Sequence, residues 1–85
     1  MVSYDDSAER SEHMNSLELE YARKRKNRSK ADMAAVIGKS EISYAKKERG
    51  EVKFSDEEKV CVSKELELTT EQFNAIFFDG NLPLW

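Results

Sequence analysis

Helix-start signals recur at short intervals along the chain, and they constrain its fold more than any other feature. Five segments open on a residue whose side chain can accept a hydrogen bond from the first helical turn: Asn15, Ser29, Ser40, Ser55 and Thr69. Glycine or proline stands at the stops that follow several of them, at Gly38, Gly50, Gly80 and Pro83. We therefore predict five helices over residues 15–26, 29–38, 40–48, 55–66 and 69–78.

Helices this short must share a core, because segments of about 8–12 residues are not stable alone in water. The apolar residues predict which positions form that core: Leu17, Leu19, Tyr21, Ala22, Met33, Ala34, Val36, Ile37, Val60, Cys61, Val62, Leu66, Phe73, Ile76, Phe77 and Phe78. With 85 residues there is room for one small all-α domain. We place it at 15–78, between a flexible acidic arm (1–14) and an apolar tail (79–85).

The net charge of −3 hides an uneven distribution along the chain. Residues 21–53 contain eleven basic and four acidic residues and carry +7, whereas residues 1–20 and 54–85 each carry −5. A basic segment of this kind is typical of a surface that binds a polyanion such as nucleic acid. A solvated helix face has the same composition, so charge alone leaves both interpretations open.

The sequence lacks the residues that several classes of function require. No stretch approaches the ~18 apolar residues of a membrane-spanning helix, and the acidic N-terminus is unlike a signal peptide, so we expect a cytoplasmic protein. The single cysteine, Cys61, excludes an internal disulfide and a cysteine-based zinc site, and His13 has no second metal ligand nearby. Without a nucleophile–base pair or a glycine-rich phosphate loop, we expect no catalysis, cofactor or metal.

The basic segment contains two predicted helices at helix-turn-helix spacing. Gly38 ends the first and can adopt the positive φ of a tight turn between helices. Ala34, four residues earlier, lets the next helix cross closely, and Tyr44, six residues after the glycine, anchors that helix in the core. Its exposed side is then a candidate for insertion into the major groove of DNA.

An ordered set of short motifs runs through the five predicted helices: Arg23, Met33-Ala34, Ile37-Gly38, Ser40, Glu48-Arg49-Gly50, and residues 54–58, 66–69 and 71–78. Together they resemble the lambda-repressor/Cro-like helix-turn-helix regulators, the xenobiotic-response-element class. The resemblance implies a compact five-helix DNA-binding domain. It also implies a sequence-specific transcriptional regulator, a repressor of the phage or mobile-element type found in Gram-positive bacteria.

The resemblance assigns base reading to the outward face of the third helix, formed by Ser40, Glu41, Ile42, Ala45 and Lys46. Lys46 can donate to guanine or phosphate, Glu41 can accept from a cytosine amino group, and Ile42 can touch a thymine methyl. Glu41 is equally well explained as a solvated acid favoured by the helix dipole. A second register of this helix would bury Ile42 and redirect the face.

Phosphate contacts are expected from residues around the two helices: Ser29, Lys30, Lys39, Lys47, Arg49 and Lys53. Ser29 and Lys30 stand at a helix N-terminus, where phosphate commonly binds. The apolar stems of Lys39 and Lys47 are expected to cover the core while their ammonium groups reach water or phosphate. We expect Arg23 to be a structural ion-pair partner rather than a DNA contact.

The tail ends in three large apolar side chains, Leu82, Leu84 and Trp85. They either cap the core or form a homodimer contact that places two recognition helices roughly 34 Å apart on palindromic double-stranded DNA. A second class of function is also open: a protein-interaction module, such as an antitoxin or inhibitor, that uses the same fold to engage another protein.

Overall fold

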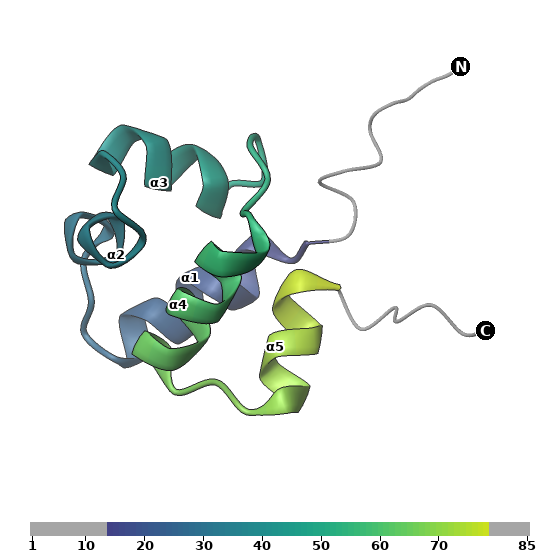
Figure 1. Cartoon of the computed structure of the whole chain (residues 1–85). Coiled ribbons are helices and arrows are strands. Elements are labelled where there is room, and N and C mark those ends of the chain that lie inside the picture. The colour runs from purple at the N-terminus through teal and green to yellow at the C-terminus, as the bar shows by residue number, and fades with distance from the viewer. Residues whose placement is uncertain (1–13, 79–85) are drawn as a thin grey trace, which may run out of the picture.

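Five helices make up the part of the chain that the computed structural model describes, residues 14–78. They are α1 (Ser16–Arg25), α2 (Lys30–Ile37), α3 (Glu41–Glu48), α4 (Asp56–Leu66) and α5 (Thr70–Phe77), and this region contains no strand. α2 packs against α3 and α4, while α1 packs against α5 and α3 (Figure 1). No helix between residues 14 and 78 combines the length and apolar character needed to cross a membrane.

Each helix begins where its capping residue predicts. The cap side chain accepts a hydrogen bond of 2.9–3.2 Å from the backbone N–H three residues later, at Asn15, Ser29, Ser40, Ser55 and Thr69. In α2, α4 and α5 the backbone N–H of the cap residue in turn donates to the side-chain oxygen of the third helical residue, which is Asp32, Glu58 or Gln72. The start of each of the five helices is therefore determined by residues within its own first turn.

The helix ends differ in the residue that takes the left-handed conformation. α2 ends at Gly38, with φ +72°. The N–H of Lys39 then donates to the carbonyl of Ala34 at 2.9 Å, which closes the last turn. α4 ends at Glu67 with φ +53°, although a side chain disfavours that conformation. The left-handed position is thus occupied by glycine after α2 and by a residue with a side chain, Glu67, after α4.

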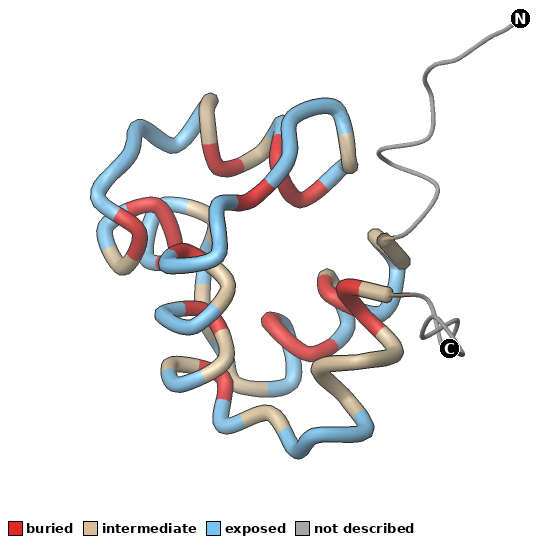
Figure 2. The backbone as a smooth tube through the Cα atoms, turned by 45° about the vertical axis from the view of Figure 1, so that its right-hand side comes forward, coloured by how far each residue is buried: buried red, intermediate tan, exposed pale blue. Residues whose placement is uncertain are grey.

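A single core joins the five helices and the connection before α4. Its buried apolar residues are Leu19, Ala22, Met33, Ala34, Ile37, Tyr44, Phe54, Val62, Leu66, Ile76 and Phe77. Buried and exposed residues alternate along the helices, so each helix presents one side to this core (Figure 2). The ring of Phe54 links α3 to α5, because it makes edge contacts with Tyr44 at 6.0 Å and Phe77 at 5.6 Å.

Four of the predicted core residues are exposed instead: Leu17, Tyr21, Val60 and Cys61. The prediction that Cys61 fills the core is therefore wrong. Consecutive residues of a helix are 100° apart, so the run 60–62 cannot all face inward. Val62 and Leu66, one turn apart, take the buried positions of α4.

Predictions about the two ends of the chain lie outside the described residues. They concern the arm before Met14, including His13, and the apolar tail with Leu82, Leu84 and Trp85. Met14 itself is half-buried against the core. The next residue, Asn15, donates its backbone N–H to the carbonyl of Ile76 at 2.7 Å. The start of α1 is thus fastened to the end of α5.

Candidate nucleic-acid interface

The outward face of α3 carries the predicted base-reading residues. Glu41, Ile42 and Lys46 are exposed, and Ala45 is half-buried. Ile42 has 72% of its surface exposed, which excludes the register that would bury it. Ser40 is also exposed, but its hydroxyl is occupied as the helix cap, accepting from the N–H of Ser43 at 3.1 Å. In Figure 1, α3 lies along the upper edge of the molecule, with its other side toward the core.

A buried ion pair holds the inner side of α3 against α1. The guanidinium of Arg23 donates to the Glu48 carboxylate through Nε at 2.8 Å and Nη2 at 3.2 Å. Both side chains are only 6% exposed, and Arg23 also donates to the carbonyl of Arg28 at 2.9 Å. The hydrogen bond to Glu48 raises the pKa of Arg23, which keeps its charge. The side chain of Arg23 is therefore committed to a structural role in holding α3.

A second buried ion pair links α3 to α4, and it corrects the prediction made for Lys47. The Lys47 Nζ donates to Glu58 Oε1 at 2.8 Å and to the carbonyl of Lys53 at 3.3 Å. Both side chains of the pair are 10% exposed. The ammonium group therefore points into the protein rather than toward water or phosphate, because a buried lysine needs a compensating acid.

Glu58 has two partners beside Lys47. Its Oε1 accepts the Ser55 N–H at 2.9 Å, and its Oε2 lies 3.9 Å from Lys39 Nζ. Burial raises the pKa of Glu58, but the hydrogen bonds from Lys47 and the Ser55 backbone and the two lysine charges outweigh it, so the pKa is lowered. One carboxylate thus caps α4 and holds lysines from both α3 and the turn before it.

The remaining basic residues near α3 differ in how free they are. Lys46 and Lys53 are exposed, with no ion pair inside the region 14–78. Arg49 Nε contacts Glu51 Oε2 at 2.7 Å, and that contact lowers the pKa of Glu51. Lys39 is exposed and touches Glu58 only at 3.9 Å. On the outward face of α3, Lys46 is therefore a cation without an ion pair among residues 14–78.

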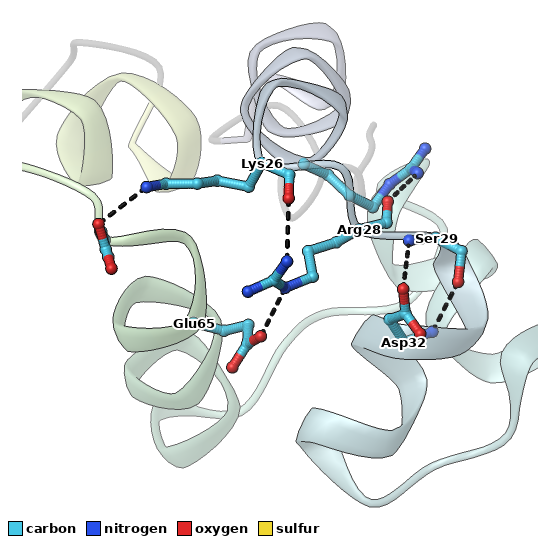
Figure 3. Close-up of polar contacts among 7 residues, drawn as sticks. Lys26, Arg28, Ser29, Asp32 and Glu65 are labelled. Carbon is cyan, nitrogen blue, oxygen red and sulfur yellow. Dashed lines mark hydrogen bonds and ion pairs between the residues drawn. The ribbon is translucent and has the colours of Figure 1, made fainter.

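The N-terminus of α2 already holds an anion. The Asp32 carboxylate accepts the N–H of Ser29 at 2.9 Å, and the Ser29 hydroxyl accepts the N–H of Asp32 at 2.9 Å (Figure 3). The hydrogen bond from the Ser29 backbone lowers the pKa of Asp32, so it stays negative. A phosphate at this position would face a carboxylate, so Lys30, half-buried and without an ion pair among the described residues, is the group that remains for it.

Most other bases of the central segment are paired within the chain. Figure 3 shows Arg28 reaching to Glu65 of α4, a contact of 2.7 Å. Lys26 Nζ lies 2.8 Å from the carboxylate of Glu67, where α4 ends. Two further contacts lie within α1, from Lys24 to Glu20 and from Arg25 to the ring of Tyr21. The acids after residue 54 thus neutralise part of the positive charge of residues 21–53. The surface formed by this segment therefore carries less net positive charge than the segment's own sequence suggests.

Two acids that organise this region, Glu48 and Glu58, were not assigned a structural role from the sequence. Glu58 had one available signal, because it stands three residues after Ser55 in a capping box. Nothing in the local sequence indicated that either acid is buried. The described residues contain no group of three His, Cys, Asp or Glu side chains placed to hold a metal.

Comparison with known proteins yields no match to this chain, whether among protein families, curated proteins or solved structures.

Proposed function

We propose that the protein is a sequence-specific DNA-binding transcriptional regulator, a repressor of the phage or mobile-element type, that inserts α3 into the major groove. The observation that carries the proposal is the division of α3 into two faces. Tyr44, Lys47 and Glu48 hold it in place from the inside, and Ile42 and Lys46 project outward without a partner in the described region. A short helix held rigidly at the edge of a domain suits groove reading.

The outward side chains have chemistry that matches base edges. Lys46 can donate to guanine O6 and N7, and the branched side chain of Ile42 can contact a thymine methyl group. Glu41, in the first turn, can accept from a cytosine amino group. Lys30, Lys39, Arg49 and Lys53 supply the cations for phosphate contacts. A homodimer on a palindromic operator would present two such helices to successive major grooves.

Selection of bound sequences from a random double-stranded DNA pool, run at two salt concentrations, tests the proposal. We expect one enriched motif at both salts. On that motif, Lys46→Ala should weaken binding by about 1–3 kcal/mol, because a bidentate base contact is lost. Lys64→Ala is the matched control, since Lys64 is exposed, lies near the end of α4 and has no ion pair among the described residues.

The two variants separate the outcomes. Affinity of the Lys64→Ala protein should equal that of the wild type. If Lys46→Ala binds the enriched motif as tightly as the wild type, α3 does not read bases as proposed. If no motif is enriched at either salt, DNA is not the target.

The second candidate is a protein-interaction module, and exposed apolar side chains near α3 favour it. Ile42 is 72% exposed, and Val52, in the connection between α3 and α4, is 44% exposed. Apolar side chains without a partner are typical of protein contacts as well as of thymine recognition. No enriched DNA motif at either salt, together with a co-purifying protein that is lost from the Ile42→Ser variant, would favour this second candidate; an enriched motif that is lost in Ile42→Ser would argue for DNA.

A further inference from the structure

Helix α1 carries a second exposed apolar surface, on the side away from the core. Leu17 is 76% exposed and Tyr21, one turn later, is 61% exposed. The guanidinium carbon of Arg25, a further turn along, lies 5.1 Å from the centre of the Tyr21 ring. Leu17, Tyr21 and the stem of Arg25 therefore form one stripe along the helix, which we call the α1 stripe.

The charges beside the α1 stripe are divided between its two ends. The acids Glu18 and Glu20 lie in the first half of α1, and the bases Lys24 and Arg25 lie in the second half. Glu20 and Lys24 are paired within the helix at 2.8 Å, whereas Glu18 has no ion pair in the region 14–78. α1 thus runs from a negative end to a positive end.

We propose that α1 is a homodimer interface, in which the α1 stripes of two copies pack antiparallel about a two-fold axis near Tyr21. Antiparallel packing brings Glu18 of each copy to Arg25 of the partner subunit, so that two opposite-charge contacts flank the apolar side chains. Parallel packing would instead place like charges together. The distribution of charge along α1 therefore complements itself in one orientation only.

This interface does not overlap the proposed DNA-binding face. The inner face of α1 contacts α3 through Arg23 and Glu48, while the α1 stripe lies on the opposite side of the helix. Pairing through the stripe consequently leaves the outward face of α3 uncovered. A single ten-residue helix makes a small contact, so we expect weak self-association, with Kd on the order of 100 μM.

Sedimentation equilibrium of the full chain without DNA, up to about 1 mM protein, tests the proposal. We expect a monomer–dimer equilibrium in the wild type. Leu17→Gln and Tyr21→Gln should each raise Kd by about tenfold or more, because a two-fold interface loses the side chain twice. Val60→Gln is the matched control, since Val60 is 50% exposed on α4, and its Kd should be unchanged.

Charge reversal gives a test of the orientation. Glu18→Arg and Arg25→Glu should each weaken the dimer by about fivefold, and the double variant should return Kd to within about twofold of the wild type. The two residues are seven positions apart, roughly 10 Å along the helix, so they cannot restore each other within one chain. Circular dichroism of each variant should show the same helix content as the wild type, so that a change in Kd reports on the interface.

Three outcomes would overturn the proposal. The first is a chain that remains monomeric over the whole concentration range, as expected if another part of the chain covers the stripe. The second is a dimer that survives Leu17→Gln and Tyr21→Gln, which would place the contact elsewhere. The third is a double charge reversal that stays as weak as the single variants, which would exclude the antiparallel arrangement.

Discussion

Lys47 and Glu58 form a buried pair in which each charge depends on the other. Glu58→Gln leaves the Lys47 ammonium buried without an opposite charge. We expect this change to lower the free energy of unfolding by about 2–3 kcal/mol. Glutamine can still accept the N–H of Ser55, so the cap of α4 is kept. Urea unfolding followed by circular dichroism measures the loss.

The partner variants of this pair provide the controls. Lys47→Met together with Glu58→Gln removes both charges and should recover more than half of the loss, because an apolar side chain replaces the buried ammonium. Glu65→Gln breaks the more exposed contact with Arg28 and should cost less than about 1 kcal/mol. A double variant as unstable as the sum of the single changes would show that the two charges are not coupled.

The lowered pKa of Glu58 predicts how the stability of the protein responds to acid. Its pKa is lower in the folded protein than the ordinary value of 4.5, so the folded state binds the proton less readily than the unfolded state. The resulting stabilisation is complete above pH 4.5 and is lost as the pH falls through the lowered pKa of the folded state. Urea midpoints measured from pH 7 to lower pH should fall less steeply below pH 4.5 in Glu58→Gln than in the wild type. Parallel curves would contradict this assignment.

Among the helices and turns, the connection between α2 and α3 depends on the conformation of Gly38. Its φ of +72° disfavours a side chain, although a Cβ there would meet nothing within 4 Å. Gly38→Ala should therefore cost about 1 kcal/mol through the backbone alone, and Gly38→Asn less, because asparagine tolerates this conformation better. Thermal and urea unfolding measure both. Equal stability of the glycine and alanine proteins would be inconsistent with the left-handed turn.

The end of α4 allows the opposite substitution, from a residue with a side chain to glycine. Glu67 adopts φ +53° without being glycine, and its exposed carboxylate contacts Lys26. Glu67→Gly should stabilise the protein because the backbone conformation is relieved. Glu67→Gln removes the charge while keeping the side chain, and it separates the contribution of the ion pair from that of the turn.

The extent of each helix could be predicted because its cause is local. Ser55 and Glu58 exchange hydrogen bonds across three residues, and that spacing is visible in the sequence. The buried side of α4 was less predictable, because the run 60–62 contains three apolar residues and only Val62 faces the core. Which residue of such a run is buried depends on the helices packed around it.

The partners of the buried charges could not be predicted, because these residues pair over long distances in the sequence. Arg23 and Glu48 are 25 positions apart, and Lys47 and Glu58 are 11 apart. The sequence correctly predicted a structural ion pair for Arg23 but not its partner. One of the two registers open for the third helix leaves Ile42 exposed, as it is in the fold, whereas the burial of the Lys47 ammonium group required knowledge of where α4 packs.

Internal pairing predicts a modest salt dependence for the proposed DNA binding. If Lys30, Lys39, Arg49 and Lys53 each contact one phosphate, the logarithm of the affinity should fall with the logarithm of the salt concentration with a slope of roughly −4 per protomer. Binding titrations on the selected motif at several salt concentrations measure this slope. A slope steeper than about −5 per protomer would mean that bases paired with acids after residue 54, such as Lys26 and Arg28, are released to the DNA.

The division of α3 into two faces has a consequence for how such proteins can diversify. Ile42 and Lys46 take no part in attaching the helix to the domain, which depends on Tyr44, Lys47 and Glu48. Mutation can therefore replace the outward side chains at little cost to folding. Ser40 is the exception, since its hydroxyl begins the helix. Descendants of one ancestral chain can in this way differ in the outward side chains of α3 while they inherit the same scaffold.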